Sequence, residues 1–142
     1  MGNLSAFMAQ NALKVENIKH CPSNRFVGKD GKPIEWELTC LTSQEDEELR
    51  KFCTKRVKVP GKKNQFTMET DYNLYLGKLA SKCTVFPNLN DAELQNSYGV
   101  MGDDALLKAM LTPGEYADYL SKVQEINGFD IAFDELVDEA KN

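Results

Sequence analysis

Apolar and polar residues alternate most clearly between positions 34 and 40. Ile34, Trp36, Leu38 and Cys40 are separated by polar residues, which is the period of two that a half-buried strand requires. The preceding stretch 28–33 reads Gly-Lys-Asp-Gly-Lys-Pro, and glycine and proline in this arrangement favour a turn. We therefore predict a hairpin that pairs this strand with Arg25-Phe26-Val27. Residues 15–27 otherwise fit neither the helical nor the strand period.

A capping box predicts the start of a helix at Thr42. Thr42-Ser43-Gln44-Glu45 precedes a run of acids at 45–48, which complement the helix dipole. This helix runs to about Lys55. Its predicted inward residues are Leu49, Phe52 and Cys53.

A second hairpin is predicted where a turn at 60–64 joins residues 57–59 to residues 66–70. Thr70 or Asp71 then caps a helix that runs to about Cys83. The predicted inner stripe of this helix comprises Tyr72, Tyr75, Leu76, Leu79 and Cys83.

Helical periodicity dominates the second half. Predicted helices begin near Asp91, Gly102, Thr112 and Asp130, and residues 4–14 predict a further short N-terminal helix. The fold class is therefore α+β and predominantly helical, with short β-hairpins in the first half and a helical second half. Residues 1–142 form a single predicted domain, and we expect residues 1–14 to be a mobile N-terminal helix.

The charge is unevenly distributed along the 142 residues. The net charge is −5, yet residues 103–142 hold ten acids and three bases. This balance argues against a general nucleic-acid binder. The apolar runs are also much shorter than the roughly 20 residues needed to cross a bilayer, and the first residues lack the pattern of a secretory signal. We expect a cytoplasmic chain without nucleic-acid or membrane partners.

Catalytic and metal-binding patterns are absent from the sequence. The four cysteines have no CxxC spacing, and His20 is the only histidine. There is no GxSxG, P-loop or GxGxxG motif. We therefore predict a non-enzymatic protein with structural thiols and with neither cofactor nor metal.

Two other patterns have both a structural and a functional interpretation. Five cations gather at Lys55, Arg56, Lys58, Lys62 and Lys63. They are explained by helix C-cap charge and edge-strand protection, or by a basic hairpin that grips an acidic protein surface. Leu4, Phe7 and several methionines are explained by core packing or by a soft binding surface.

Three ordered blocks resemble the XkdN-like family of phage tail assembly chaperones. The first is Arg25-Phe26 with Gly31-Lys32-Pro33-Ile34-Glu35-Trp36-Glu37-Leu38 and Leu41-Thr42; the second is Pro87-Asn88-Leu89 with Leu94-Gln95-Asn96-Ser97-Tyr98-Gly99-Val100-Met101-Gly102. The third is Leu106-Leu107, Met110-Leu111-Thr112-Pro113-Gly114-Glu115-Tyr116 and Glu125-Ile126-Asn127-Gly128-Phe129. Together they span about residues 25–133.

The resemblance implies a non-catalytic protein of a phage or prophage that binds the tape measure protein, and also tail tube subunits, during tail morphogenesis. It implies action in the bacterial host cytoplasm and absence from the mature virion. We expect the client to occupy an apolar groove between the last two helices, since an aggregation-prone client requires apolar surface. The candidate partner-binding residues are Tyr116, Tyr119, Leu120, Phe129, Phe133, Leu136 and Val137.

Two alternatives stay open at this point: a minor structural tail component and a small regulatory binding protein. A DNA-binding regulator would lose affinity steeply with salt, whereas a structural component would assemble into rings or tubes. Weak self-association is compatible with all of these roles.

Overall fold

The computed structural model describes residues 2–129 as an α+β fold, as predicted. The helices are the 3-10 helix η1 (Gly2–Phe7), α1 (Ser43–Phe52), α2 (Tyr72–Cys83), α3 (Ala92–Ser97), α4 (Asp103–Met110) and α5 (Pro113–Ile126). The strands are β1 (Ile18–His20), β2 (Trp36–Leu38), β3 (Thr54–Lys58), β4 (Phe66–Thr70) and β5 (Thr84–Phe86). Helices hold fewer than half of the described residues, so helical predominance is a property of the second half alone.

A three-stranded antiparallel sheet lies at the centre of the fold, with the order β1-β2-β5. β2 is the predicted strand, but its partners are β1, where Ile18 lies opposite Leu38, and β5. The predicted pairing of this strand with Arg25-Phe26-Val27 is therefore wrong, because its partners are Ile18–His20 and Thr84–Phe86. Residues 26–34 instead close a loop through one bridge between Val27 and Pro33, with Gly31 at a φ of 77° in its turn.

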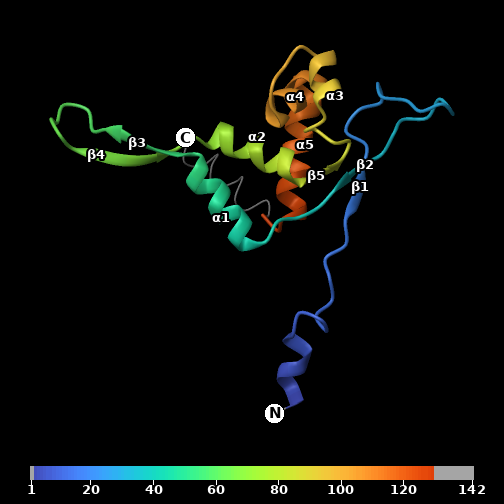
Figure 1. Cartoon of the computed structure of the whole chain (residues 1–142), viewed down its shortest axis with the longest axis horizontal. Helices are drawn as coiled ribbons and strands as arrows, with labels where there is room; N and C mark the ends of the chain where they lie inside the picture. Colours follow the sequence, from blue (N-terminus) through green and yellow to red (C-terminus); the bar gives the residue numbers. More distant parts are fainter. Residues whose placement is uncertain (1, 130–142) are drawn as a thin grey trace.

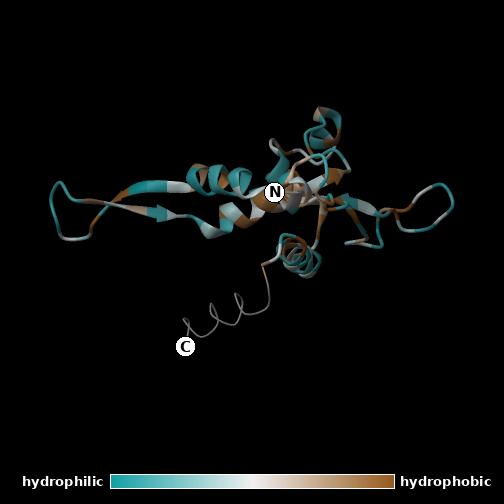
Figure 2. Ribbon diagram, turned by 90° about the horizontal axis from the view of Figure 1, so that it is seen from below, coloured by the Kyte–Doolittle hydropathy of each residue, from teal (hydrophilic) through white to brown (hydrophobic). Residues whose placement is uncertain are grey.

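β3 and β4 form a second hairpin at the predicted turn, separate from the central sheet, but β3 begins at Thr54, within residues predicted to end the preceding helix. Five residue pairs join the two strands, from Thr54 opposite Thr70 to Lys58 opposite Phe66. We call residues 54–70 the arm, because this hairpin projects from the body (Figure 1). Figure 2 shows the same projection from below, with the loop around residue 30 extending from the opposite end.

The predicted capping residues begin four of the helices. The side chains of Thr42, Asp71, Asp91 and Thr112 each accept a hydrogen bond from a backbone N–H of the first turn. Capping boxes are complete at α1 and α5. These are local interactions, which explains why the sequence was sufficient to locate them.

The core joins the central sheet to α2, α4 and α5, with one side chain from α1. Its largest fully buried side chains are Trp36, Tyr119, Leu38, Leu79, Leu89, Leu106, Leu107 and Val123. Two predicted inward residues are not part of it. Phe52 is 68% exposed and Tyr72 is also exposed, because α1 turns only Leu49 into the core and α2 begins at the edge of the body.

The N-terminal segment differs from the helix predicted over 4–14. Only Gly2–Phe7 is helical, with 3-10 geometry; a turn at residues 8–12 and an irregular connection then lead to β1. Figure 1 shows this segment standing away from the body. Within residues 2–129, no helix has both the length and the apolar character needed to cross a bilayer.

Candidate functional site

α5 carries part of the predicted partner surface, and two interactions fix its first turn. Glu115 accepts a hydrogen bond from the backbone N–H of Thr112, while Thr112 Oγ1 accepts one from Glu115 N. Arg25 donates to Glu115 at 2.9 Å and also to the carbonyl of Met110. The hydrogen bond from Arg25, followed by that from Thr112, lowers the pKa of Glu115 to about 2.

Tyr119 lies in the core, where it is fully buried. Its ring packs edge-on against Trp36 with centroids 5.4 Å apart, and its hydroxyl lies 2.6 Å from Thr84 Oγ1. Burial raises the pKa of the Tyr119 hydroxyl. The Tyr119 side chain is therefore not accessible to a partner in this structure, and it packs α5 against the core.

Tyr116, Leu120 and Phe129 are half-buried and pack against the core cluster. The Arg50 guanidinium of α1 lies 5.8 Å from the Phe129 ring centroid, so the end of the described chain lies against α1. The structure brings these three residues to the periphery of the core. Phe133, Leu136 and Val137 lie outside the described residues.

Asn127 is a positioning residue for which the sequence predicted no side-chain role. Its Oδ1 accepts a hydrogen bond from Leu41 N at 2.9 Å, and its Nδ2 donates to Val123 O at 2.7 Å. Asn127 therefore joins the end of α5 to the chain that follows β2. Asn followed by Gly is typical of a helix end, but the local sequence does not predict the hydrogen bond to Leu41, which is distant in sequence.

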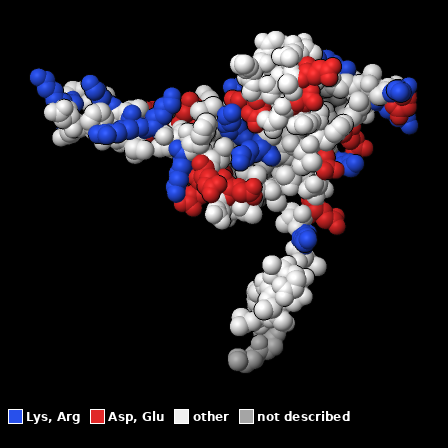
Figure 3. Space-filling model, viewed as in Figure 1, with Lys and Arg blue, Asp and Glu red and all other residues white. Residues whose placement is uncertain are grey.

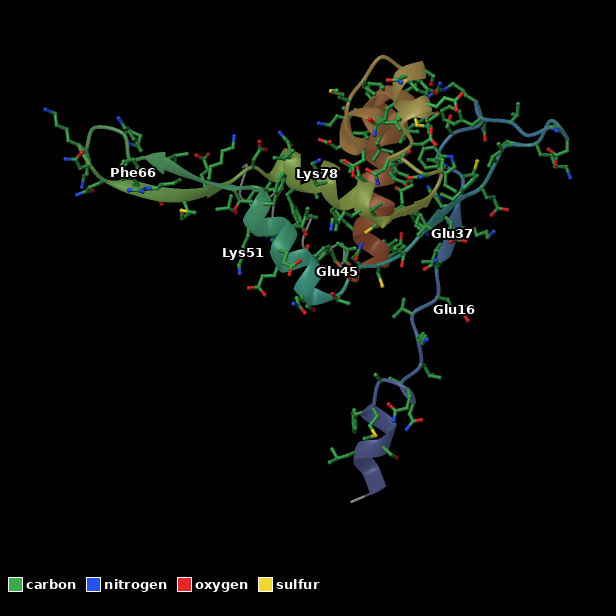
Figure 4. The ribbon with its side chains drawn as sticks, in the orientation of Figure 1. Glu16, Glu37, Glu45, Lys51, Phe66 and Lys78 are labelled. Atoms are coloured by element: carbon green, nitrogen blue, oxygen red, sulfur yellow. The ribbon has the colours of Figure 1, made fainter. Side chains whose placement is uncertain are left out.

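The N-terminal segment carries a group of five exposed large apolar side chains. Phe7 is 79% exposed and Leu13 is 98% exposed. Leu4, Met8 and Val15 are exposed as well. Figure 4 shows side chains projecting from this segment beyond the labelled Glu16, and Figure 3 shows its outer part without charge. Of the two interpretations, these exposures do not fit core packing for Leu4 and Phe7.

A hollow of about 250 Å³ lies between α1, α2 and the start of α4. Its lining combines Leu49 and Phe52 with charged side chains, including Lys78, Lys82 and Asp103. The Lys78 ammonium forms ion pairs with Asp103 at 3.2 Å and Asp104 at 3.0 Å. Because Asp103 and Asp104 neutralise the Lys78 ammonium, this cation is not available to bind an anionic ligand in the hollow.

The titratable groups do not assemble into a reactive centre in the described part of the chain. Residues 2–129 contain no group of three or more His, Cys, Asp or Glu side chains placed to hold a metal ion. Desolvation raises the pKa of Cys83 to about 11 and also raises that of Cys53, which favours the thiol over the nucleophilic thiolate. Burial is likewise the main cause that lowers the pKa of His20.

Comparisons with known proteins extend over almost the whole chain. Residues 4–141 match the family model described as the phage XkdN-like tail assembly chaperone protein. The chain is similar to the XkdN protein of the phage-like element PBSX of Bacillus subtilis (strain 168), with 33% identity over 99% of this chain and 94% of that protein. The YqbN protein of the same organism is also 33% identical, over 99% of this chain and 93% of its own length.

A crystal structure of the protein YqbN has a similar fold. The two superpose with a TM-score of 0.75 at 30% sequence identity, covering 89% of this chain and 97% of that one. The likeness therefore includes the three-dimensional arrangement as well as the sequence.

Proposed function

The chain belongs to the family of phage XkdN-like tail assembly chaperones, and we propose that it binds the tape measure protein, and also tail tube subunits, during tail morphogenesis. Assisting tail assembly is a non-catalytic role. The resemblance of the three sequence blocks implies these partners, action in the host cytoplasm and absence from the finished tail. We therefore interpret the exposed surfaces of this chain as contacts for tail proteins.

The observation that carries the proposal is the exposed apolar surface of the N-terminal segment. The exposed side chains of Leu4, Phe7 and Leu13 form an apolar surface that can bury apolar residues of the client. Burying about 100 Å² of apolar surface stabilises a complex by roughly 2.5 kcal/mol before the costs of association. Three such side chains would contribute about 7.5 kcal/mol, which is comparable with the cost of association, so stable client binding also needs a second contact.

A second contact is proposed along the half-buried residues of α5 and the chain that follows it. Tyr116, Leu120 and Phe129 would contribute its described part, and Phe133, Leu136 and Val137 would extend it. Tyr119 is left out of this surface because its side chain is fully buried. The helical spacing of Phe133, Leu136 and Val137 supports their inclusion.

Co-expression with the tape measure and tail tube proteins of the same phage tests the proposal. We expect this chain to keep the tape measure protein in the soluble fraction and to co-purify with it. The triple variant Leu4→Ser/Phe7→Ser/Leu13→Ser should reduce the co-purified amount severalfold. A matched control, Val27→Ser/Met101→Ser, changes exposed apolar residues elsewhere and should retain binding. If neither tail protein binds the wild-type chain, the proposed partners are wrong.

The α5 surface needs its own variant. Phe133→Ser/Leu136→Ser/Val137→Ser should lower the soluble fraction of the client while circular dichroism shows an intact fold. Unchanged client solubilisation by this folded variant would remove the α5 surface from the proposal and leave the N-terminal contact standing.

A further inference from the structure

The arm concentrates positive charge in an acidic protein. Residues 54–70 hold five basic side chains and one carboxylate, a net charge of +4, so the other 125 residues carry −9 together. Figure 3 shows the Lys and Arg side chains along the projecting arm. An acidic partner is therefore attracted to the arm and repelled by the rest of the molecule.

The strand register divides the arm into two different faces. Directly opposite residues share a face, and alternate residues along a strand do too. Arg56 lies opposite Met68 and Lys58 lies opposite Phe66. One face, which we call the cationic face, therefore combines Arg56 and Lys58 with Phe66 and Met68. The other face places Lys55 opposite Glu69 and Val57 opposite Thr67.

The cationic face is open to solvent. Phe66 is 42% exposed and Met68 is 65% exposed, and the Arg56 guanidinium lies 3.8 Å from the Phe66 ring centroid. Figure 4 labels Phe66 on the projecting part of the arm. Among residues 2–129, no ion pair involves a cation of the arm. The face thus presents unneutralised cations beside exposed apolar groups.

The two structural explanations for these cations do not account for the face. α1 ends at Phe52, and its last turn already contains Arg50 and Lys51, so Lys55 and Arg56 do not serve as its C-terminal charges. Edge-strand protection explains the lysines. It does not explain why Phe66 and Met68 are exposed on the same face, because exposed apolar groups invite the association that lysines prevent.

We propose that the cationic face docks an acidic amphipathic helix of a partner protein. Carboxylates on this helix pair with Arg56 and Lys58, while its apolar side chains cover Phe66 and Met68. A five-residue strand is about 17 Å long, and this length matches roughly 11 residues of helix. The inference deepens the proposed function, on which it rests, by assigning a chemistry to one segment of a tail partner.

Nucleic acid fits the face less well. A polyanion also attracts Lys and Arg, but it offers no aliphatic surface to Met68, and most single-strand sites use several stacking rings. Phe66 is the only aromatic residue within the arm. The charge of −9 on the remaining residues further opposes a long polyanion.

Fluorescence anisotropy with the full chain tests the inference. The probe is a labelled 14-residue peptide of Glu, Ala and Leu, with Leu at helical spacing; a scrambled peptide of the same composition has no apolar face. The variants Arg56→Glu/Lys58→Glu and Phe66→Ser/Met68→Ser should each weaken binding about tenfold. The control Lys29→Glu/Lys32→Glu, which reverses two exposed cations in the loop around residue 30, should bind within about twofold of wild type.

Four results would overturn the inference, provided that circular dichroism shows folded variants. These are unchanged binding by Arg56→Glu/Lys58→Glu, equal binding of the scrambled peptide, tighter binding of a 20-base-pair DNA duplex, and tighter binding of a peptide copying residues 130–142. The last result would mean that the cationic face binds this chain's own residues 130–142 in place of a partner. If the chain binds the peptide but not the tape measure protein, only the proposed function is refuted. If it binds the tape measure protein but not the peptide, only the arm inference is refuted.

Discussion

Replacing Tyr119 by Phe separates its hydrogen bond from its packing. Thr84 Oγ1 donates to the carbonyl of Ala80 at 2.8 Å, so the proton between Thr84 and Tyr119 belongs to the Tyr119 hydroxyl. The two oxygens are 2.6 Å apart and both side chains are buried. Removing this neutral hydrogen bond should lower the free energy of unfolding by about 1 kcal/mol, while the ring keeps its contact with Trp36.

Urea denaturation and calorimetry measure this loss. A decrease of about 1 kcal/mol corresponds to a Tm decrease of roughly 4 °C for a domain of this size. Tyr119→Ala should cost about 3–5 kcal/mol because it also opens a cavity in the core. At equal folded fraction, Tyr119→Phe should bind the client as well as wild type does.

A double-mutant cycle with Thr84→Val tests whether the two hydroxyls interact. Both single variants remove the same hydrogen bond, so the double variant should lose about 1 kcal/mol less than the sum of the two. Additivity to within about 0.3 kcal/mol would mean that the two hydroxyls do not interact. Unchanged stability of Tyr119→Phe would refute the reasoning from burial.

Three further predictions concern caps, pH and thiols. Thr112→Ala should lower the free energy of unfolding by about 1 kcal/mol in urea denaturation, because α5 loses its N-cap; an unchanged midpoint would exclude this cap. The folded-state pKa of Glu115 is depressed from 4.5 to about 2, so its stabilisation is present above pH 4.5 and is lost as the pH falls toward 2. Arg25→Met should reduce this acid dependence in pH-resolved melts, and an unaltered acid limb would contradict the pairing. Native protein should react with a thiol reagent at half-exposed Cys21 before buried Cys83, and peptide mapping of the labelled sites would expose the reverse order.

The elements that the sequence predicted well depend on neighbouring residues. The capping boxes at Thr42 and Thr112 act over three residues, and both helices begin where the sequence predicted. β1 was missed because Ile18–His20 is only three residues long and exists through its pairing with β2. Periodicity carries no information about such a distant partner.

The candidate site was less predictable, because helical spacing identifies a stripe without stating how much of it is covered. Tyr119 and Leu120 are adjacent in an apolar pattern, yet one is fully buried and the other half-buried. Phe52 has the spacing of an inward residue and lies at the exposed end of α1. The packing of α5 and α1 against the other elements decides both outcomes, and that information resides in long-range contacts.

The separation of the N-terminal segment from the body has a consequence for how the chain can diverge. Its apolar side chains are exposed, so replacing them should leave the free energy of unfolding almost unchanged. The client contact proposed for this segment is then independent of foldability, whereas the contact proposed along α5 uses residues that also pack against the core. Under this proposal, a lineage or a protein engineer can retune the first fifteen residues for a new client without redesigning the core that carries them.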